Sequence, residues 1–132
     1  MGPICRFETK EALEAGLKEW QERLFLQDWN IDIVRVPQSS IPGSWGETIL
    51  HFENHVAQIQ MLDQMPLSNM ERYCEERILV HELLHLRYNL LENTESYEGK
   101  YLDEIQHSDL EKLAKSLIMA KYQVPFSWFK NF

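Results

Sequence analysis

The sequence predicts a single α+β domain over residues 1–132, with helices on one face of a small, mostly antiparallel sheet. Three observations lead to this fold class. Apolar residues follow helical spacing up to residue 28, alternate as in strands between residues 29 and 61, and return to helical spacing up to residue 122. A chain of 132 residues also fits one domain with a two-layer core.

The first predicted element is an N-terminal helix that begins after Thr9 and ends near Asp28. The hydroxyl of Thr9 can cap the first turn. Leu13, Leu17 and Trp20 then recur at helical spacing and predict the buried side of this helix.

Three strands are predicted next, at residues 29–36, 45–52 and 55–61. In the first of them, Trp29, Ile31 and Ile33 alternate with polar residues, which is typical of a strand with one buried face. Between the second and third strands, Glu53 and Asn54 suit a tight hairpin.

A long helix is predicted from Ser68 to about Leu91. Ser68 and Glu71 have the spacing of a capping box, in which each side chain bonds a backbone N–H at the start of a helix. A C-terminal helix is predicted over residues 101–122, after a polar loop at residues 93–100. An aromatic tail follows, and we expect it to pack back onto the domain.

An HExxH motif, formed by His81, Glu82 and His85, lies within the predicted long helix. Four residues of an α-helix turn through about 400°, so the two imidazoles lie on one face, one turn apart. Both can bind one Zn²⁺ ion, and Glu82 can act as general base on a metal-activated water. Two histidines and a glutamate are costly to bury in so apolar a segment unless they are paired or bind a metal. The motif therefore predicts a zinc-dependent metallopeptidase that hydrolyses peptide bonds.

A third protein ligand is expected downstream, because a catalytic zinc has three protein ligands and one open position. The metzincin pattern is excluded, since Tyr88 and Leu91 stand where that pattern has glycine and histidine. The candidates all belong to the predicted last helix, and they are Asp103, Glu104, His107, Asp109 and Glu111.

Helical spacing selects among these candidates. His107 lies one turn before Leu110 and faces the core side, so it is the preferred third ligand. Glu104 lies one turn earlier near the same face and is the alternative. Asp109 and Glu111 are expected to be solvated.

Three other residues have side chains that suit a site. Tyr88 lies seven residues after His81 and shares its face, so it is a candidate for hydrogen bonding a developing oxyanion, although packing is the commoner role of such a tyrosine. His51 and His55 flank the predicted hairpin, and we interpret them as surface histidines rather than a second metal site.

Residues 79–86, LVHELLHL, resemble the metal-binding helix of minimal zincins from phages, prophages and their hosts, which include ImmA/IrrE-type proteases and SprT-like proteins. A tryptophan-led strand and an Ala/Ile-rich strand before this helix are similar too. In ImmA/IrrE-type sequences the third ligand is a glutamate in a segment like ExxANxFAxxLLMP. Residues 107–120 resemble that segment, with His107 in place of the glutamate. The resemblance covers residues 29–120 and implies a phage- or prophage-type metallopeptidase that binds an extended substrate along a strand edge within residues 45–61.

The net charge of −8 makes nucleic-acid binding by this domain alone unexpected, because an acidic surface repels phosphates. The N-terminus lacks the apolar stretch of a signal peptide, and no apolar run approaches a membrane span. We therefore expect a cytoplasmic protein that binds no membrane and acts on a protein or peptide substrate. Two alternatives stay open: a catalytically silent zinc-binding protein that serves as a binding or regulatory module of a phage or prophage, and a metal-dependent hydrolase of a non-peptide amide.

Overall fold

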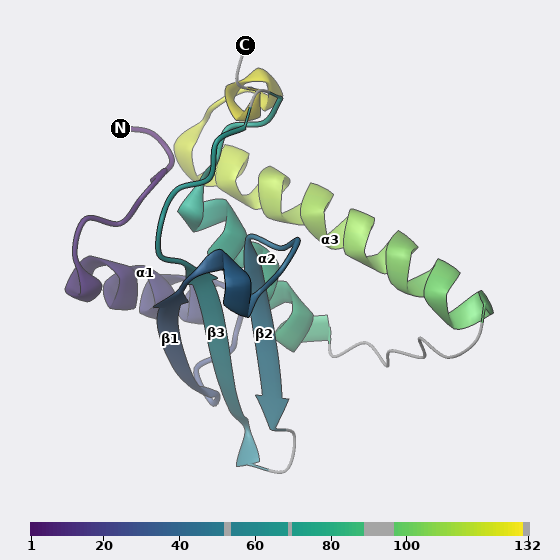
Figure 1. The fold of residues 1–132 in the computed structure, drawn as a ribbon. Coiled ribbons are helices and arrows are strands. Elements are labelled where there is room, and N and C mark those ends of the chain that lie inside the picture. Colours follow the sequence, from purple (N-terminus) through teal and green to yellow (C-terminus); the bar gives the residue numbers. More distant parts are fainter. Residues whose placement is uncertain (52–53, 69, 89–96, 131–132) are drawn as a thin grey trace.

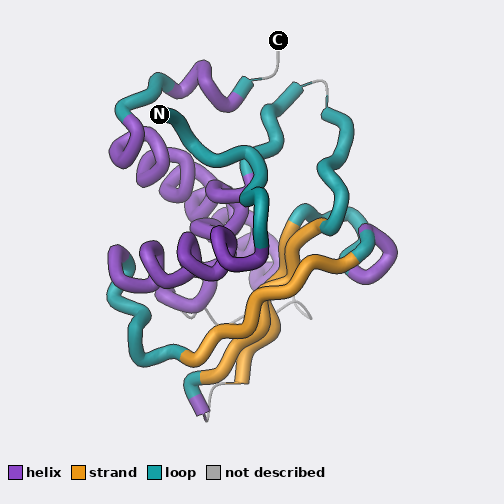
Figure 2. The backbone as a smooth tube through the Cα atoms, turned by 90° about the vertical axis from the view of Figure 1, so that its left-hand side faces the viewer, coloured by secondary structure: helices purple, strands orange, loops and turns teal. Residues whose placement is uncertain are grey.

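Helices lie on one side of a three-stranded sheet, which makes the described chain an α+β protein (Figure 1). The structure, a computed structural model, describes residues 1–51, 54–68, 70–88 and 97–130, without the side chains of residue 51 and residues 97–106. Its main elements are α1 (Lys10–Arg23), β1 (Asn30–Val36), β2 (Gly46–His51), β3 (Val56–Leu62), α2 (Glu75–Tyr88) and α3 (Tyr97–Tyr122). The short 3₁₀ helices η1 (Gln38–Ser40) and η3 (Phe126–Phe129) follow β1 and α3. Figure 2 shows the helices and the sheet as separate layers.

The sheet is mixed, and the prediction of a mostly antiparallel sheet was wrong. Its strand order is β1-β3-β2, and β3 pairs parallel with β1 and antiparallel with β2. The consecutive strands β1 and β2 do not pair, because β3 returns between them. The central position suits β3, since Ala57, Ile59 and Met61 are at most 1% exposed. This order leaves β2 at one edge of the sheet.

The N-terminal helix is shorter than predicted. The hydroxyl of Thr9 accepts a hydrogen bond of 3.0 Å from a backbone N–H of the first turn. The helix ends at Arg23 rather than near Asp28, because Phe25 takes the left-handed backbone conformation with a φ of 58°. The turn buries Leu26, which is 3% exposed, so packing ends this helix early.

The start predicted for the long helix was wrong, because α2 begins at Glu75. The hydroxyl of Ser68 accepts a hydrogen bond of 3.2 Å from the N–H of Glu71, so the local turn of the capping box forms. The helix does not continue from it, because Glu71 pairs in a β-bridge with Lys130 of the C-terminal segment. The predicted end near Leu91 lies outside the described residues.

The first turn of α2 is held by the N-terminal segment of the chain. The backbone N–H groups of Glu75 and Glu76 donate to the carbonyl oxygens of Cys5 and Ile4, at 2.9 and 3.1 Å. The N–H groups at a helix start have no partner within the helix, and these contacts supply two of them. The N-terminal segment thereby anchors the helix that carries the HExxH motif.

The buried side chain of Glu76 joins the three main helices. Its Oε2 accepts hydrogen bonds of 2.8 Å from the Trp20 indole of α1 and from Lys121 of α3. Its Oε1 accepts a bond of 2.5 Å from the Tyr122 hydroxyl. Because Glu76 is only 1% exposed, these contacts fix α3 against α2 in a medium of low dielectric constant.

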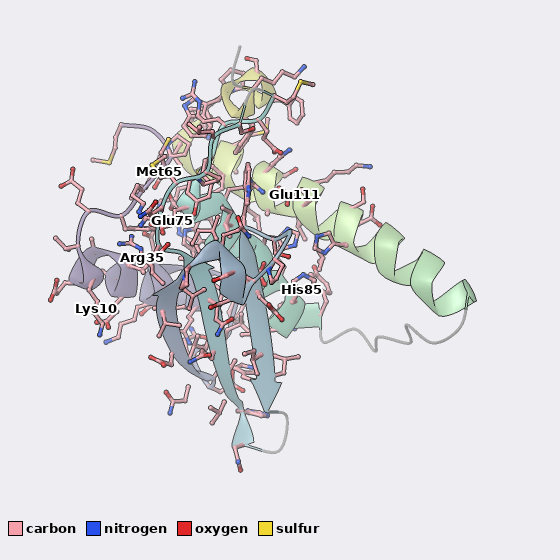
Figure 3. All side chains as sticks on the ribbon, viewed as in Figure 1. Lys10, Arg35, Met65, Glu75, His85 and Glu111 are labelled. Atoms are coloured by element: carbon pink, nitrogen blue, oxygen red, sulfur yellow. The ribbon has the colours of Figure 1, made fainter. Side chains whose placement is uncertain are left out.

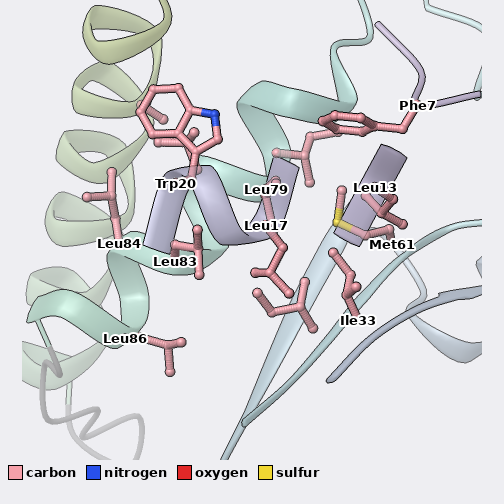
Figure 4. Packing of buried hydrophobic residues seen from close by; sticks show 14 of the residues in the cluster. Phe7, Leu13, Leu17, Trp20, Ile33, Met61, Leu79, Leu83, Leu84 and Leu86 are labelled. Atoms are coloured by element: carbon pink, nitrogen blue, oxygen red, sulfur yellow. The ribbon is translucent and has the colours of Figure 1, made fainter. Parts of the chain in front are cut away.

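The core lies between the sheet and the helices, and α2 runs through it (Figure 4). Two adjacent turns of α2 bury Leu79, Val80, Leu83 and Leu84 to 1% exposure or less. Each such side chain contributes roughly 1.5–3 kcal/mol when it leaves water. A helix buried on most of its surface can place the polar residues His81 and Glu82 in a dry environment.

The C-terminal helix begins at Tyr97, so the predicted polar loop was wrong for residues 97–100, and its other residues lie outside the described part. It ends at Tyr122, where Gln123 has a positive φ of 56°, before Pro125. None of the described helices is both long enough and apolar enough to cross a membrane.

The aromatic tail packs back onto the domain, as predicted. Phe129 is 1% exposed, and its carbonyl accepts a hydrogen bond of 2.6 Å from the N–H of Arg72. The guanidinium of Arg72 also lies 4.3 Å from the ring centroid of Trp128. These contacts explain why residues 71–74 are extended rather than helical.

Candidate functional site

Three histidines from two helices meet at one point. The Nε2 atoms of His81 and His85, one turn apart on α2, lie 3.2 Å apart. His107 of α3 joins them, and one ligand atom of each of the three residues lies within 4.8 Å of the others. The structure thus brings together the two motif histidines and the preferred third candidate. His81 is buried and His107 is exposed, so the cluster opens toward solvent on the side of α3.

The donor set fits a zinc ion. Two imidazole nitrogens bound to one tetrahedral zinc at about 2.0–2.1 Å would be roughly 3.3 Å apart, close to the separation of His81 and His85. Burial, followed by the nearby charges of His81 and His107, lowers the pKa of His85 to about 4. His85 is therefore neutral at pH 7, which is the form of histidine that binds metals.

Glu111 of α3 is part of this site, and the expectation that it is solvated was wrong. Its Oε2 lies 2.8 Å from Nδ1 of His81, and its Oε1 lies 2.5 Å from Nη1 of Arg77. Burial opposes the ionisation of Glu111, but the close contact with His81 and the charge of Arg77 outweigh burial and lower its pKa to about 2. A carboxylate beside Nδ1 leaves Nε2 of His81 as the nitrogen that could bind a metal.

One sequence signal could have identified Glu111. It follows His107 by four residues, so on a helix both side chains lie on the same face. Its charge suggested a solvated position, and the contact that overrides this comes from His81 on another helix.

Glu82 is buried beside the histidines, on the side of the sheet edge. It is 6% exposed, and its Oε1 accepts a hydrogen bond of 2.7 Å from the hydroxyl of Thr48 on β2. A Cβ at Gly46 would lie 3.2 Å from Oε2 of Glu82 and 2.8 Å from a methyl carbon of Ile78, so only glycine fits there without a shift. Burial raises the pKa of Glu82, against the opposing effects of His81 and Thr48, and makes it a stronger base.

The site opens into a hollow of about 210 Å³ between β2, α2 and α3. Its lining consists of Gly43, Ser44, Trp45, Gly46, Arg77, Ile78, His81, Glu82, His107 and Glu111. A larger hollow of about 490 Å³ between α1 and β1 contains none of the predicted site residues. Tyr88 is 50% exposed and does not line the hollow at the histidines, so nothing in this geometry assigns it an oxyanion contact.

The remaining candidates lie away from the histidine cluster or outside the described part. Asp109 is exposed, as predicted. The side chains of Glu104, Asp103 and His51 lie outside the described residues. His55 is exposed, stacks on Trp29 with a centroid distance of 5.1 Å and is not part of the histidine cluster.

Replacement of Glu111 by glutamine is expected to weaken zinc binding by roughly 10–100-fold, because the carboxylate that orients His81 is lost. The measurement is competition with a chromogenic zinc chelator. Asp109→Asn is the matched control, since it removes an exposed carboxylate from the same helix and should leave the affinity unchanged. Equal zinc affinities for Glu111→Gln and the wild type would contradict an orienting role for Glu111.

Comparison with known proteins does not assign this chain to a family. No protein-family model, curated protein or solved structure matches the chain. The class of protein is therefore inferred from the residue types and their geometry.

Proposed function

We propose that this chain is a zinc-dependent metallopeptidase, with His81, His85 and His107 as the metal ligands. The observation that carries the proposal is the meeting of the HExxH histidines with a third histidine, beside a buried glutamate in one hollow. Three protein ligands leave one position for a water or a substrate, as in catalytic rather than structural zinc sites. Glu82 supports catalysis further, because a purely structural site has no need of a base.

The residues of the chain suit the hydrolysis of an amide. When bound, zinc supplies Lewis-acid polarisation of a carbonyl and a lowered pKa for a bound water. Glu82 accepts the proton of the attacking water and returns it to the leaving amine. The hydroxyl of Thr48 holds Oε1 of Glu82 at 2.7 Å and thereby orients the carboxylate for both transfers.

The edge strand β2 suits an extended peptide. Thr48 pairs with Ile59 of β3 on one side of β2, and the order of the strands leaves the other side at the sheet edge. Gly46 of β2 lines the hollow that contains Glu82 and His107. A substrate that adds to this edge through main-chain hydrogen bonds would pass the histidine cluster.

The test of the metal site is zinc content, measured by mass spectrometry on protein purified without chelators or affinity metal. We expect about one zinc per chain in the wild type, by the stoichiometry of structural and catalytic sites. Zinc should be lost in His81→Ala and His107→Ala and retained in Glu104→Ala. His55→Ala is the matched control, because His55 is exposed and lies outside the cluster.

The outcomes separate the alternatives. Loss of zinc in Glu104→Ala but not in His107→Ala would show that the third ligand is Glu104 rather than His107. Absence of zinc from the wild-type chain purified in this way would refute the metallopeptidase proposal.

A further inference from the structure

Arg77 is a buried cation in the same hollow, and one edge of its guanidinium has no acceptor among the residues that the structure describes. The side chain is 5% exposed, and Nη1 contacts Glu111 at 2.5 Å. Its Nε and Nη2 atoms are closed to water and have no hydrogen-bond partner among the described residues. Buried N–H groups without acceptors are costly, so a cation left in this state suggests a partner that binds there.

The Nε and Nη2 atoms form the edge of a guanidinium group that can donate two parallel hydrogen bonds to one carboxylate. The same chain provides an example in Arg35, whose Nε and Nη2 bond the two carboxylate oxygens of Glu75 at 3.1 and 2.7 Å (Figure 3). Such bidentate pairs are stronger and more specific than single contacts. In Arg77 the corresponding two atoms are available.

The groups around Arg77 do not fill this edge. The carboxylate of Glu71 lies 4.0 Å from Nη2, beyond hydrogen-bond distance, and is 2.6 Å from Nζ of Lys115. Glu111 occupies only Nη1. The guanidinium carbon lies over the ring of Trp45, 5.6 Å from the ring centroid, and this contact is not a hydrogen bond to Nε or Nη2. The charged side chains that line the hollow are the cation Arg77 and the carboxylates Glu82 and Glu111, so the two positive charges of a zinc ion would make the hollow net positive.

We propose that Arg77 is a specificity residue that binds a carboxylate of the substrate beside the scissile bond. This inference rests on the proposed peptidase function, for which it names the substrate class. Arg77 lies one turn before His81 on α2, and both side chains line the same hollow. The volume of about 210 Å³ is below the range of small-molecule pockets and suits one acidic side chain or a C-terminal carboxylate. Because this edge is closed to water, a carboxylate reaches it only when a neighbouring side chain moves, and the partly exposed Glu71, 4.0 Å from Nη2, is the neighbour in position to do so.

The test is peptide binding by the zinc-loaded, full-length Glu82→Gln variant, in which turnover is blocked. Three acetylated alanine heptapeptides are titrated by calorimetry: one amidated with a central glutamate, one amidated with a central glutamine, and one without either residue but with a free C-terminus. One of the carboxylate peptides should bind about tenfold more tightly than the glutamine peptide, as expected for hydrogen bonds to a charged group. The peptide that does so identifies the source of the carboxylate as a side chain or a chain terminus.

Arg77→Lys, added to the same background, should abolish this preference, because lysine keeps a charge next to Glu111 but lacks the paired N–H groups. Arg87→Lys is the matched control, since Arg87 is exposed on the same helix. Equal affinities for all three peptides, no measurable binding of any of them, or a preference that survives Arg77→Lys would overturn the proposal. The comparison between peptides needs no change at Arg77, so it holds even if that variant fails to fold. A preference that depends on Arg77 would establish the subsite even if the wild type hydrolysed no peptide, so this proposal and the peptidase proposal fail separately.

Discussion

Replacement of Glu82 by glutamine is expected to lower the rate of peptide hydrolysis by roughly 10²–10⁴-fold and to leave the zinc content unchanged. Glutamine has nearly the same shape, and its carbonyl oxygen can still accept the hydrogen bond of Thr48. It cannot accept the proton of the attacking water. Hydrolysis is measured on a fluorescent casein and on a mixed peptide library read by mass spectrometry, with zinc content determined on the same samples.

Asp32→Asn is the control for this experiment, because Asp32 is an exposed carboxylate on β1, at the opposite edge of the sheet from Thr48. Its rate should equal that of the wild type. Hydrolysis that persists in Glu82→Gln would refute the role of Glu82 as base. A wild type that binds zinc but cleaves neither probe would favour the silent zinc-binding protein or the hydrolase of a non-peptide amide.

Replacement of Glu75 by alanine is expected to destabilise the fold by about 3–5 kcal/mol, because it breaks a buried ion pair by removing one partner. Glu75 is fully buried, and its carboxylate binds Arg35 through two nitrogens at 2.7 and 3.1 Å. It also accepts a hydrogen bond of 2.9 Å from the backbone N–H of Phe7, and Nη1 of Arg6 lies 3.5 Å away. The substitution leaves two guanidinium groups and a backbone donor without this acceptor.

The free energy of unfolding is measured by urea denaturation, followed by circular dichroism. Glu14→Ala is the matched control, because Glu14 is exposed on α1, and a surface change of this kind stays within about 0.5 kcal/mol. A loss below 1 kcal/mol for Glu75→Ala would mean that water replaces the carboxylate and that the N-terminal segment is held by other contacts.

The parts of the site that the sequence predicted depend on residues close together in the chain. The pairing of His81 with His85 follows from helical geometry alone, since four residues advance the chain by about one turn. The spacing of His107 and Leu110 likewise predicted that these two residues share one side of the last helix, where Leu110 is buried and His107 is exposed beside the other two histidines. The hydrogen bond between Ser68 and Glu71 also formed, because it joins residues three apart.

Other features depended on contacts between segments far apart in the sequence. The helix did not continue from Ser68, because the backbone around Glu71 bonds the C-terminal tail instead. The strand order is another such feature, since apolar alternation marks a strand but does not say which strand lies at the centre of the sheet. Burial of Ala57, Ile59 and Met61 decided that in favour of β3.

The sequence by itself determined the order of helices and strands and the HExxH donor set, because these depend on spacing along one element, but it did not determine where each helix begins and ends. Only the tertiary structure brought His107 to that motif, placed the carboxylate of Glu111 on His81 and left one edge of Arg77 without a partner in the described part of the chain. These contacts join α2 to α3, and their partners are set by how the two helices pack, which no local pattern encodes.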